Sequence, residues 1–120
     1  MPNPRQDSSL IADLLPLSPI AFFILFTLAD GEKHGYLIMQ EVSVLSGHTL
    51  RIGPATLYTT IQRLVDQLLV EETEKEAGGR RRYYRLTKAG QELLRAELER
   101  QAAVVQLARA RKLIPLEDAQ

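Results

Sequence analysis

One stretch constrains the fold of this 120-residue chain more than any other, GPATLYTTIQRLVDQLL from Gly53 to Leu69. Pro54 stands where a helix would begin, and proline is well tolerated at the first helical position. The spacing predicts an amphipathic helix over residues 54–68 that buries one face in a core. The apolar side chains that share one arc of that helix are Leu57, Ile61, Leu64, Val65 and Leu68.

The opposite face of this helix is small or polar and carries one positive charge. A helix that enters the major groove of DNA needs such a face, slim near its N-terminus and able to donate and accept hydrogen bonds. An ordinary surface helix has the same composition, and the stretch by itself favours that interpretation. The residues on this face are Ala55, Thr56, Thr59, Gln62 and Arg63.

Composition excludes several classes of protein. The length fits one domain, and the absence of cysteine excludes disulfides and thiolate chemistry. Two histidines, His34 and His48, argue against a histidine metal site, so we expect no metal and no cofactor. The apolar run Ile20 to Leu28 is too short to span a bilayer, and residues 1–9 lack the layout of a signal peptide. We therefore expect a cytoplasmic protein without a membrane partner.

Charge is balanced overall but segregated along the chain. The formal net charge is +0 and the pI is about 6.7, which argues against a uniformly basic nucleic-acid binder. However, residues 80–88 read RRRYYRLTK without one acid, while glutamates collect elsewhere. One surface can therefore be locally positive.

Two further helices are expected before the stretch. Residues 1–17 read as an N-terminal arm in which Leu10 to Leu15 forms a helical turn. Ser18 and Pro19 start a helix to Ala29 that is apolar almost all round. We expect its phenylalanines Phe22 and Phe26 to meet a second subunit.

The second of these helices runs from Gly35 to Ser46, with Tyr36 at its start and Gly47 closing it. Three helices packed in this order, the last with a polar outer face, are typical of a helix-turn-helix. The side chains expected to point inward from the second helix are Leu37, Ile38, Val42 and Leu45.

A β-hairpin is expected after the polar-faced helix. Val70 to Lys75 and Arg82 to Leu86 alternate in character, and Gly78-Gly79 marks the turn between them. Attached to a helix-turn-helix, such a hairpin is a wing. Its arginines Arg80, Arg81 and Arg82 are candidates for phosphate or minor-groove contacts. Arginines that merely aid solubility are the alternative, and the side of the strand that Arg85 takes is left open.

The last predicted element is a long helix. Thr87 caps it, and it can continue from Lys88 to Ile114, about 40 Å, before Pro115 begins a tail over residues 115–120. So small a domain cannot bury the apolar stripe of this helix, so we expect it to pair with a second copy. The stripe consists of Leu94, Leu98, Val105 and Ala108.

These residues together resemble the PadR family of bacterial winged-helix transcriptional regulators. The resemblance covers roughly residues 18–98: Gly35-Tyr36, then GPATLYTTIQRLVDQLLV with Tyr58, then GRRRYYRLTKAG with Gly90 after the cap. A short chain with one C-terminal helix is similar to the smaller subgroup. The resemblance implies a homodimeric repressor whose C-terminal helices pack with an N-terminal segment of the partner.

The sequence departs from the family pattern at two points. The family commonly has a glycine after the reading helix where this chain has Leu68, so we expect Gln67 to take the left-handed conformation or the helix to end differently. Some relatives hold flat aromatic drugs between tryptophans, and this chain has no tryptophan. No effector is therefore assigned.

The sequence predicts a mostly α fold with a small β-hairpin, in which residues 18–86 form a winged helix-turn-helix and residues 87–114 a dimerisation helix. We expect no enzyme, because the glycine pair lies in a hairpin and not in a phosphate loop. The expected function is a homodimeric repressor on an inverted-repeat operator in double-stranded DNA. The alternative is a winged-helix module that binds protein. The expected DNA contacts are Tyr36, Pro54, Ala55, Thr56, Tyr58, Thr59, Gln62, Arg63, Arg80, Arg81 and Arg82.

Overall fold

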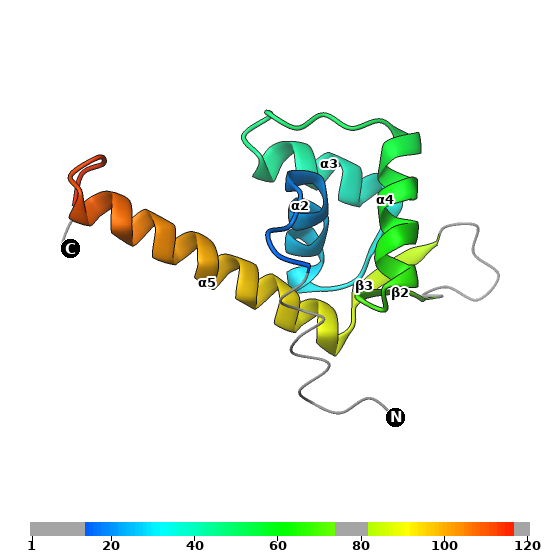
Figure 1. Cartoon of the computed structure of the whole chain (residues 1–120). Coiled ribbons are helices and arrows are strands. Elements are labelled where there is room, and N and C mark those ends of the chain that lie inside the picture. Colours follow the sequence, from blue (N-terminus) through cyan, green and yellow to red (C-terminus); the bar gives the residue numbers. More distant parts are fainter. Residues whose placement is uncertain (1–13, 74–81, 117–120) are drawn as a thin grey trace, which may run out of the picture.

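The computed structural model describes residues 14–73 and 82–116. The described chain is mostly helical with a small antiparallel sheet, as the sequence predicted (Figure 1). Its elements in order are α2 (Pro19–Thr27), the 3₁₀ helix η1 (Leu28–Asp30), β1 (Lys33–His34), α3 (Gly35–Leu45), α4 (Pro54–Asp66), β2 (Val70–Thr73), β3 (Tyr83–Leu86) and α5 (Lys88–Ala110).

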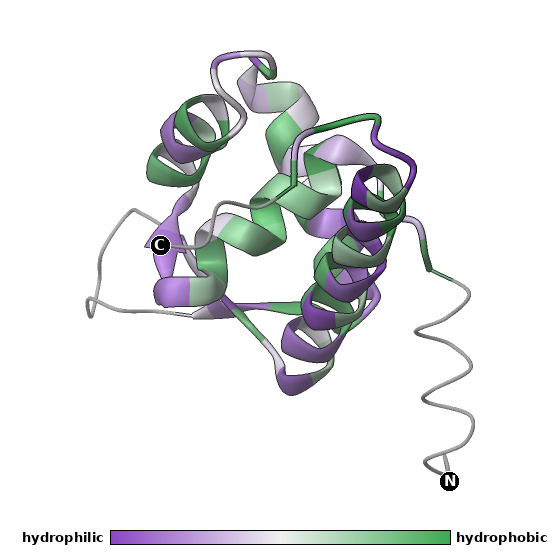
Figure 2. Ribbon diagram, turned by 90° about the vertical axis from the view of Figure 1, so that its left-hand side faces the viewer, coloured by the Kyte–Doolittle hydropathy of each residue, from purple (hydrophilic) through white to green (hydrophobic). Residues whose placement is uncertain are grey.

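Helix α2 lies at the centre of the packing. It contacts α3, α4 and α5, and its Ile24 and Leu25 have no solvent exposure. Helix α3 contributes Ile38 and Val42 to the same core. Figure 2 views the molecule roughly along α5, whose hydrophilic and hydrophobic residues alternate in bands, as expected of a helix with one apolar stripe.

The sheet has one strand more than the hairpin that the sequence predicted. The strand order is β1-β3-β2, and all pairs are antiparallel. Lys33 pairs with Tyr84, and Val70 pairs with Leu86. A two-residue strand such as β1 is too short to show the alternation by which strands are recognised in a sequence. It fixes the base of the wing to the start of α3.

The expected helix starts are confirmed, and the helix ends differ. Ser18 Oγ accepts a hydrogen bond from Ala21 N at 3.2 Å, and Thr87 Oγ1 accepts one from Gly90 N at 3.0 Å. α2 passes into η1 after Thr27, α3 stops at Leu45, and α4 stops at Asp66. α5 ends at Ala110 and not at Ile114, because the chain turns at Lys112 with φ 61° and Leu113 N donates to Ala108 O.

Two leucines expected in the core are exposed. Leu68 is 74% exposed and Leu45 is 44% exposed. Both stand at or beyond the last helical turn, where the chain leaves the helix and the 3.6-residue spacing no longer decides which way a side chain points. By contrast Leu57, Ile61 and Leu64 are buried, as the spacing predicted.

Leu68 also corrects the expected end of α4. Leu68 takes the left-handed conformation with φ 63°, whereas Gln67 keeps φ −84°. Leu69 N donates to Leu64 O at 2.9 Å, and Leu68 N donates to Val65 O at 2.9 Å. These two bonds form a Schellman ending, whose left-handed position normally belongs to glycine.

The end of α4 is bonded directly to the start of α5. Thr87 Oγ1 donates to Leu68 O at 2.7 Å, and Thr87 N donates to Leu69 O at 3.1 Å. Gly90 lies against Leu69 so closely that a Cβ there would be 3.1 Å from the Leu69 carbonyl carbon and nearer still to its oxygen. We call these four residues, Leu68, Leu69, Thr87 and Gly90, the α4–α5 junction.

A buried carboxylate ties the segment before α2 to α5. Glu97 is 1% exposed, and it accepts hydrogen bonds from Leu17 N at 3.0 Å and from Arg100 Nε at 2.5 Å. The hydrogen bond from Arg100 holds the pKa of Glu97 below its usual range, although burial acts in the opposite direction. Leu14 and Leu15 pack against the core nearby, whereas residues 10–13 of the predicted helical turn lie outside the described part.

Candidate nucleic-acid interface

The outer face of α4 is a continuous polar surface. Its inner residues are held in the core, so the exposed side chains project as one set, and Pro54 opens the helix after Gly53. A shallow hollow of about 290 Å³ runs along Ala55, Thr56, Thr59, Thr60 and Arg63. Every α4 residue that the sequence predicted to face DNA is exposed: Pro54, Ala55, Thr56, Tyr58, Thr59, Gln62 and Arg63.

Gln62 has a partner on its own helix. Its Nε2 donates to Asp66 Oδ1 at 3.0 Å. Because an ionised carboxylate only accepts hydrogen bonds, Asp66 fixes which end of the Gln62 amide carries the NH₂ group. The sequence analysis did not consider Asp66, although its position four residues after Gln62 was a signal for such a pair.

The wing begins beside α4 and carries opposite charges on its two strands. Arg82 is exposed, with its Nε 3.5 Å from Glu72 Oε1, and Arg85 pairs with Glu71. Tyr84 is buried while Arg85 is exposed, so Arg85 lies on the other side of β3. Arg80 and Arg81 lie outside the described residues.

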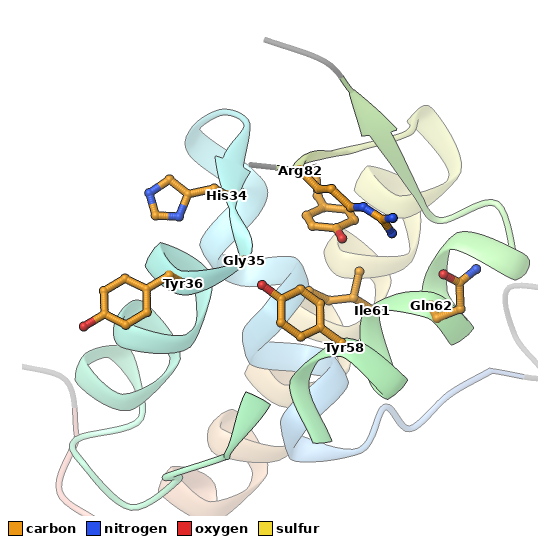
Figure 3. A pocket seen from close by; sticks show the side chains of 8 residues that line it. His34, Gly35, Tyr36, Tyr58, Ile61, Gln62 and Arg82 are labelled. Carbon is orange, nitrogen blue, oxygen red and sulfur yellow. The ribbon is translucent and has the colours of Figure 1, made fainter. Parts of the chain in front are cut away.

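A second hollow, of about 510 Å³, opens where the start of α3, α4 and β3 meet (Figure 3). It brings together four predicted contacts that are far apart in the sequence, namely Tyr36, Tyr58, Gln62 and Arg82. The remaining lining residues are His34, Gly35, Ile61 and Tyr84, which the sequence analysis did not assign to a site. We call this space the interhelix hollow.

The chemistry of the interhelix hollow is that of hydroxyl groups beside a cation. Burial, then the negative charge of Glu72, raises the pKa of Tyr84, so its phenol stays protonated. His34 is used as a cap, because its Nδ1 accepts from Leu37 N at 3.2 Å, and its ring stacks on Tyr36. His48 is exposed and lies 3.2 Å from Ser43 Oγ. His34 thus caps α3, and His48 lies at the surface.

The predicted dimerisation residues divide into two groups. Phe22 and Leu94 are buried within their own subunit. Leu98 and Val105 are each 38% exposed, and Phe26 is exposed to the same extent. Ala108 is half-buried farther along α5.

Neither a metal site nor a membrane span is found in residues 14–73 and 82–116. These residues hold no group of three His, Cys, Asp or Glu that could bind a metal ion. None of the helices in the same ranges is both long and apolar enough to cross a membrane.

A helix-turn-helix followed by a small antiparallel wing defines the winged-helix class of DNA-binding proteins. Residues 24–96 match the transcriptional regulator PadR-like family. The chain belongs to that family of DNA-binding transcriptional regulators, and it is not an enzyme.

Three relatives illustrate the match. The transcriptional regulator Rv3488 of Mycobacterium tuberculosis is 43% identical over 75% of this chain and 79% of its own length. An uncharacterized 37.1 kDa protein in transposon TN4556 of Streptomyces fradiae is 45% identical over 62% of this chain, which spans only 20% of that longer protein. The crystal structure of Bacillus subtilis PadR in complex with operator DNA superposes with a TM-score of 0.60 and 23% identity, over 68% of this chain and 47% of that one.

Proposed function

We propose that two copies of this chain form a homodimeric repressor that binds an inverted repeat in double-stranded DNA. In this proposal α4 enters the major groove, and the wing between β2 and β3 reaches the adjacent minor groove. The observation that carries the proposal is the exposed polar face of α4, backed by a fully buried face and flanked by Arg82 of the wing.

The N-terminal half of α4 is narrow enough to approach base edges. Pro54 leaves no N–H to satisfy, and Ala55 and Thr56 are short, so the helix axis can come close to the floor of a groove about 12 Å wide. Thr59 and Gln62 follow on the same exposed side. The Gln62 amide suits adenine, which offers one donor and one acceptor in the major groove.

The interhelix hollow suits the phosphate backbone. One DNA strand separates a major groove from the next minor groove, so it must cross between the reading helix and the wing. In this molecule that place is lined by Tyr36, Tyr58 and Arg82, and Figure 3 shows the Tyr58 hydroxyl pointing toward Gly35 and the Tyr36 hydroxyl pointing away from Tyr58. The Arg82–Glu72 pair is exposed and long, so a phosphate can replace Glu72 at little cost.

The projecting half of α5 supports pairing with a second copy. Beyond Leu98 the helix extends past the rest of the subunit, and Val105 and Leu107 are exposed along it (Figure 1). A two-fold dimer places two reading helices about 34–36 Å apart, one turn of B-DNA, which requires an inverted repeat. The operator complex of Bacillus subtilis PadR is a precedent for DNA binding by this fold.

Repression follows from the size of such a dimer. One subunit is 55 Å in its longest dimension, so two of them on adjacent half-sites occupy more than one turn of DNA and exclude a polymerase from it. A protein with this role works where the chromosome lies, which in a bacterium is the cytoplasm.

Selection of DNA fragments by the purified protein tests the proposal. Sheared genomic DNA retained by the protein should be sequenced, and the retained sites should share an inverted repeat. Affinity for one such site should fall steeply with salt, because phosphate contacts release counterions. A protein that enriches no sequence, or whose affinity is indifferent to salt, is instead a module that docks on protein.

The wing is tested by the same salt dependence. Changing Arg80, Arg81 and Arg82 to Ala should weaken binding to all sequences alike. The slope of log affinity against log salt should become shallower by about 1 for each phosphate that an arginine no longer neutralises. A matched variant without the three cations at the end of α5, Arg109, Arg111 and Lys112, should keep the wild-type slope. Equal slopes in all three proteins would leave the wing arginines with a solubility role.

A further inference from the structure

The first residue of α3 is Gly35, and its backbone conformation is one that any residue can adopt. Gly35 is not among the residues with positive φ, and its position in the first turn of a helix favours alanine. Glycine fits this position because there is no room for a side chain. A Cβ on Gly35 would lie 2.8 Å from Cε1 and Cζ of Tyr58, and nearer still to the Tyr58 hydroxyl.

The contact joins the two helices of the helix-turn-helix. Tyr58 extends from α4 toward Gly35, and its ring forms one wall of the interhelix hollow (Figure 3). Gly35 itself is buried, although Tyr58 is 46% exposed. One side of the ring thus lies against the Gly35 backbone, and the atoms that a Cβ would meet belong to the outer end of the Tyr58 side chain.

We infer that Gly35 is a positioning residue for DNA recognition: it leaves room for the Tyr58 ring and so allows α4 to pack beside α3 at the rotation that its buried face sets. That rotation decides whether Thr56, Thr59 and Gln62 point at base edges or past them. The inference rests on the proposed function, because it assigns a role within the same DNA-binding surface.

A substituted Gly35 must displace the ring or the helix that carries it. With Gly35→Ala the Tyr58 ring would have to swing out of its seat, or α4 would have to turn. Contacts that depend on side-chain direction, those with bases, would then suffer more than contacts that depend on charge alone. The ratio of specific to non-specific affinity is therefore the readout that separates positioning from a general loss of structure.

A double-mutant cycle tests this inference. Four proteins are compared: wild type, Gly35→Ala, Tyr58→Ala and the double variant. Gly35→Ala alone should weaken binding to the selected operator by roughly 2- to 100-fold, the range expected for residues in direct contact. Its affinity for random DNA should change less, and its Tm should fall by several degrees. In the Tyr58→Ala background the same change should leave affinity unaltered and should raise Tm, because the ring is gone and alanine is the better helix residue.

Two further variants complete the design. Gln40→Ala, on the exposed side of α3, is the control for any alanine in that helix and should behave as wild type. Tyr58→Phe keeps the ring in its seat and removes only the hydroxyl, so it should preserve the specificity ratio. If Gly35→Ala does not fold, the double variant still should, since the clash is removed.

The possible failures are distinguishable. If the wild-type protein has no affinity for DNA, the proposed function is wrong. The Tm values of the four proteins then still test the contact between Gly35 and the Tyr58 ring. If Gly35→Ala has an effect of the same size with and without the Tyr58 ring, the contact between Gly35 and Tyr58 has no positioning role, whatever the protein binds. A loss that is equal for operator and random DNA overturns the positioning role.

Discussion

At the scale of single residues, the orientation of the Gln62 amide would decide which base α4 reads in the proposed complex with DNA. Asp66 holds the NH₂ end of Gln62, which leaves the Gln62 carbonyl and one remaining N–H free to point outward. That pair matches the N6 donor and N7 acceptor of adenine. A glutamine without this partner can turn its amide over and so match other bases as well.

Gln62→Ala is therefore expected to cost about 1–3 kcal/mol at the preferred site and to relax base preference at one position of each half-site. Asp66→Asn should keep most of the affinity but broaden the preference, because an asparagine can satisfy either end of the amide. Selection from random-sequence DNA measures both effects, and Gln67→Ala, at the C-cap of the same helix, is the control. Unchanged selected sites for Gln62→Ala and Thr59→Ala together would show that this face is not the reader.

The burial or exposure of single residues was predictable from the sequence where the 3.6-residue helical spacing determined it. The 3.6-residue spacing identified Leu57, Ile61 and Leu64 as buried and the opposite face of α4 as exposed. Glu97 was missed, because an acid among the charges of a long helix gives no sign that a backbone N–H from a residue 80 positions away will reach it. The seat of Tyr58 on Gly35 was missed for the same reason, since both residues were noted but nothing local joins them.

At the scale of elements, the C-terminal end of α4 carries an avoidable strain. Leu68 stands in the left-handed region, which costs a non-glycine residue roughly 1–2 kcal/mol, and its exposed side chain gains little in return. Leu68→Gly should raise the free energy of unfolding by about 1 kcal/mol and Tm by several degrees. Thermal denaturation followed by circular dichroism measures the shift.

A control for Leu68→Gly is Gln40→Gly. Gln40 is exposed inside α3, where glycine is expected to lower stability by about 0.5–1 kcal/mol. Two destabilised variants would mean that Leu68 makes contacts worth more than its strain.

Helices and strands were predictable from the sequence where they were long or where particular residues marked their ends. Ser18, Thr87 and the prolines marked helix starts, and the long period of α5 fixed its course to within its last turn. Strand β1 was missed because Lys33 and His34 form a strand only by pairing with β3. Such pairing joins residues that are far apart in the sequence, so local sequence patterns do not predict it.

The anchoring of α5 should depend on pH through Glu97. Its pKa is lowered on folding, so its contribution to stability is present above the unfolded value of about 4.3 and is lost as pH falls through the lower folded value. The stability difference between wild type and Glu97→Gln should therefore shrink as urea denaturation is repeated from pH 7 down to pH 3. Glu99→Gln, at an exposed position of α5, is the control. A difference that stays constant with pH would show that the carboxylate acts by shape and not by charge.

At the scale of the whole molecule, dimerisation should be required for specific binding. Leu94 is buried within its own subunit, so a test must use Leu98 and Val105, which are exposed on the same stripe. Leu98→Glu with Val105→Glu would bury unpaired carboxylates twice over by symmetry, at a cost of several kcal/mol each. The double variant should sediment as a monomer, and its affinity for the operator should fall toward roughly 10⁻⁴–10⁻⁶ M.

The control for this pair is Ala103→Glu, on another face of α5, which should remain dimeric. A Leu98/Val105 variant that stays dimeric and binds its operator fully would mean that α5 is not the interface. A footprint on a single asymmetric half-site would contradict two-fold symmetry from the DNA side.

The α4–α5 junction makes the long helix a lever arm. α5 has 23 residues and is therefore about 35 Å long, so a tilt of about 5° where Thr87 and Gly90 meet Leu68 and Leu69 moves the far end by roughly 3 Å. In the proposed dimer, a comparable displacement at the far end of α5 would tilt the whole DNA-binding part of each subunit, because Leu93, Leu94 and Glu97 hold α5 against that part. A change of roughly 3.4 Å in the separation of the two reading helices would equal the rise of one base pair. In that proposed dimer the spacing of the two reading helices would depend on a junction that touches no DNA, and a molecule that bends α5 would change this spacing without contacting the groove.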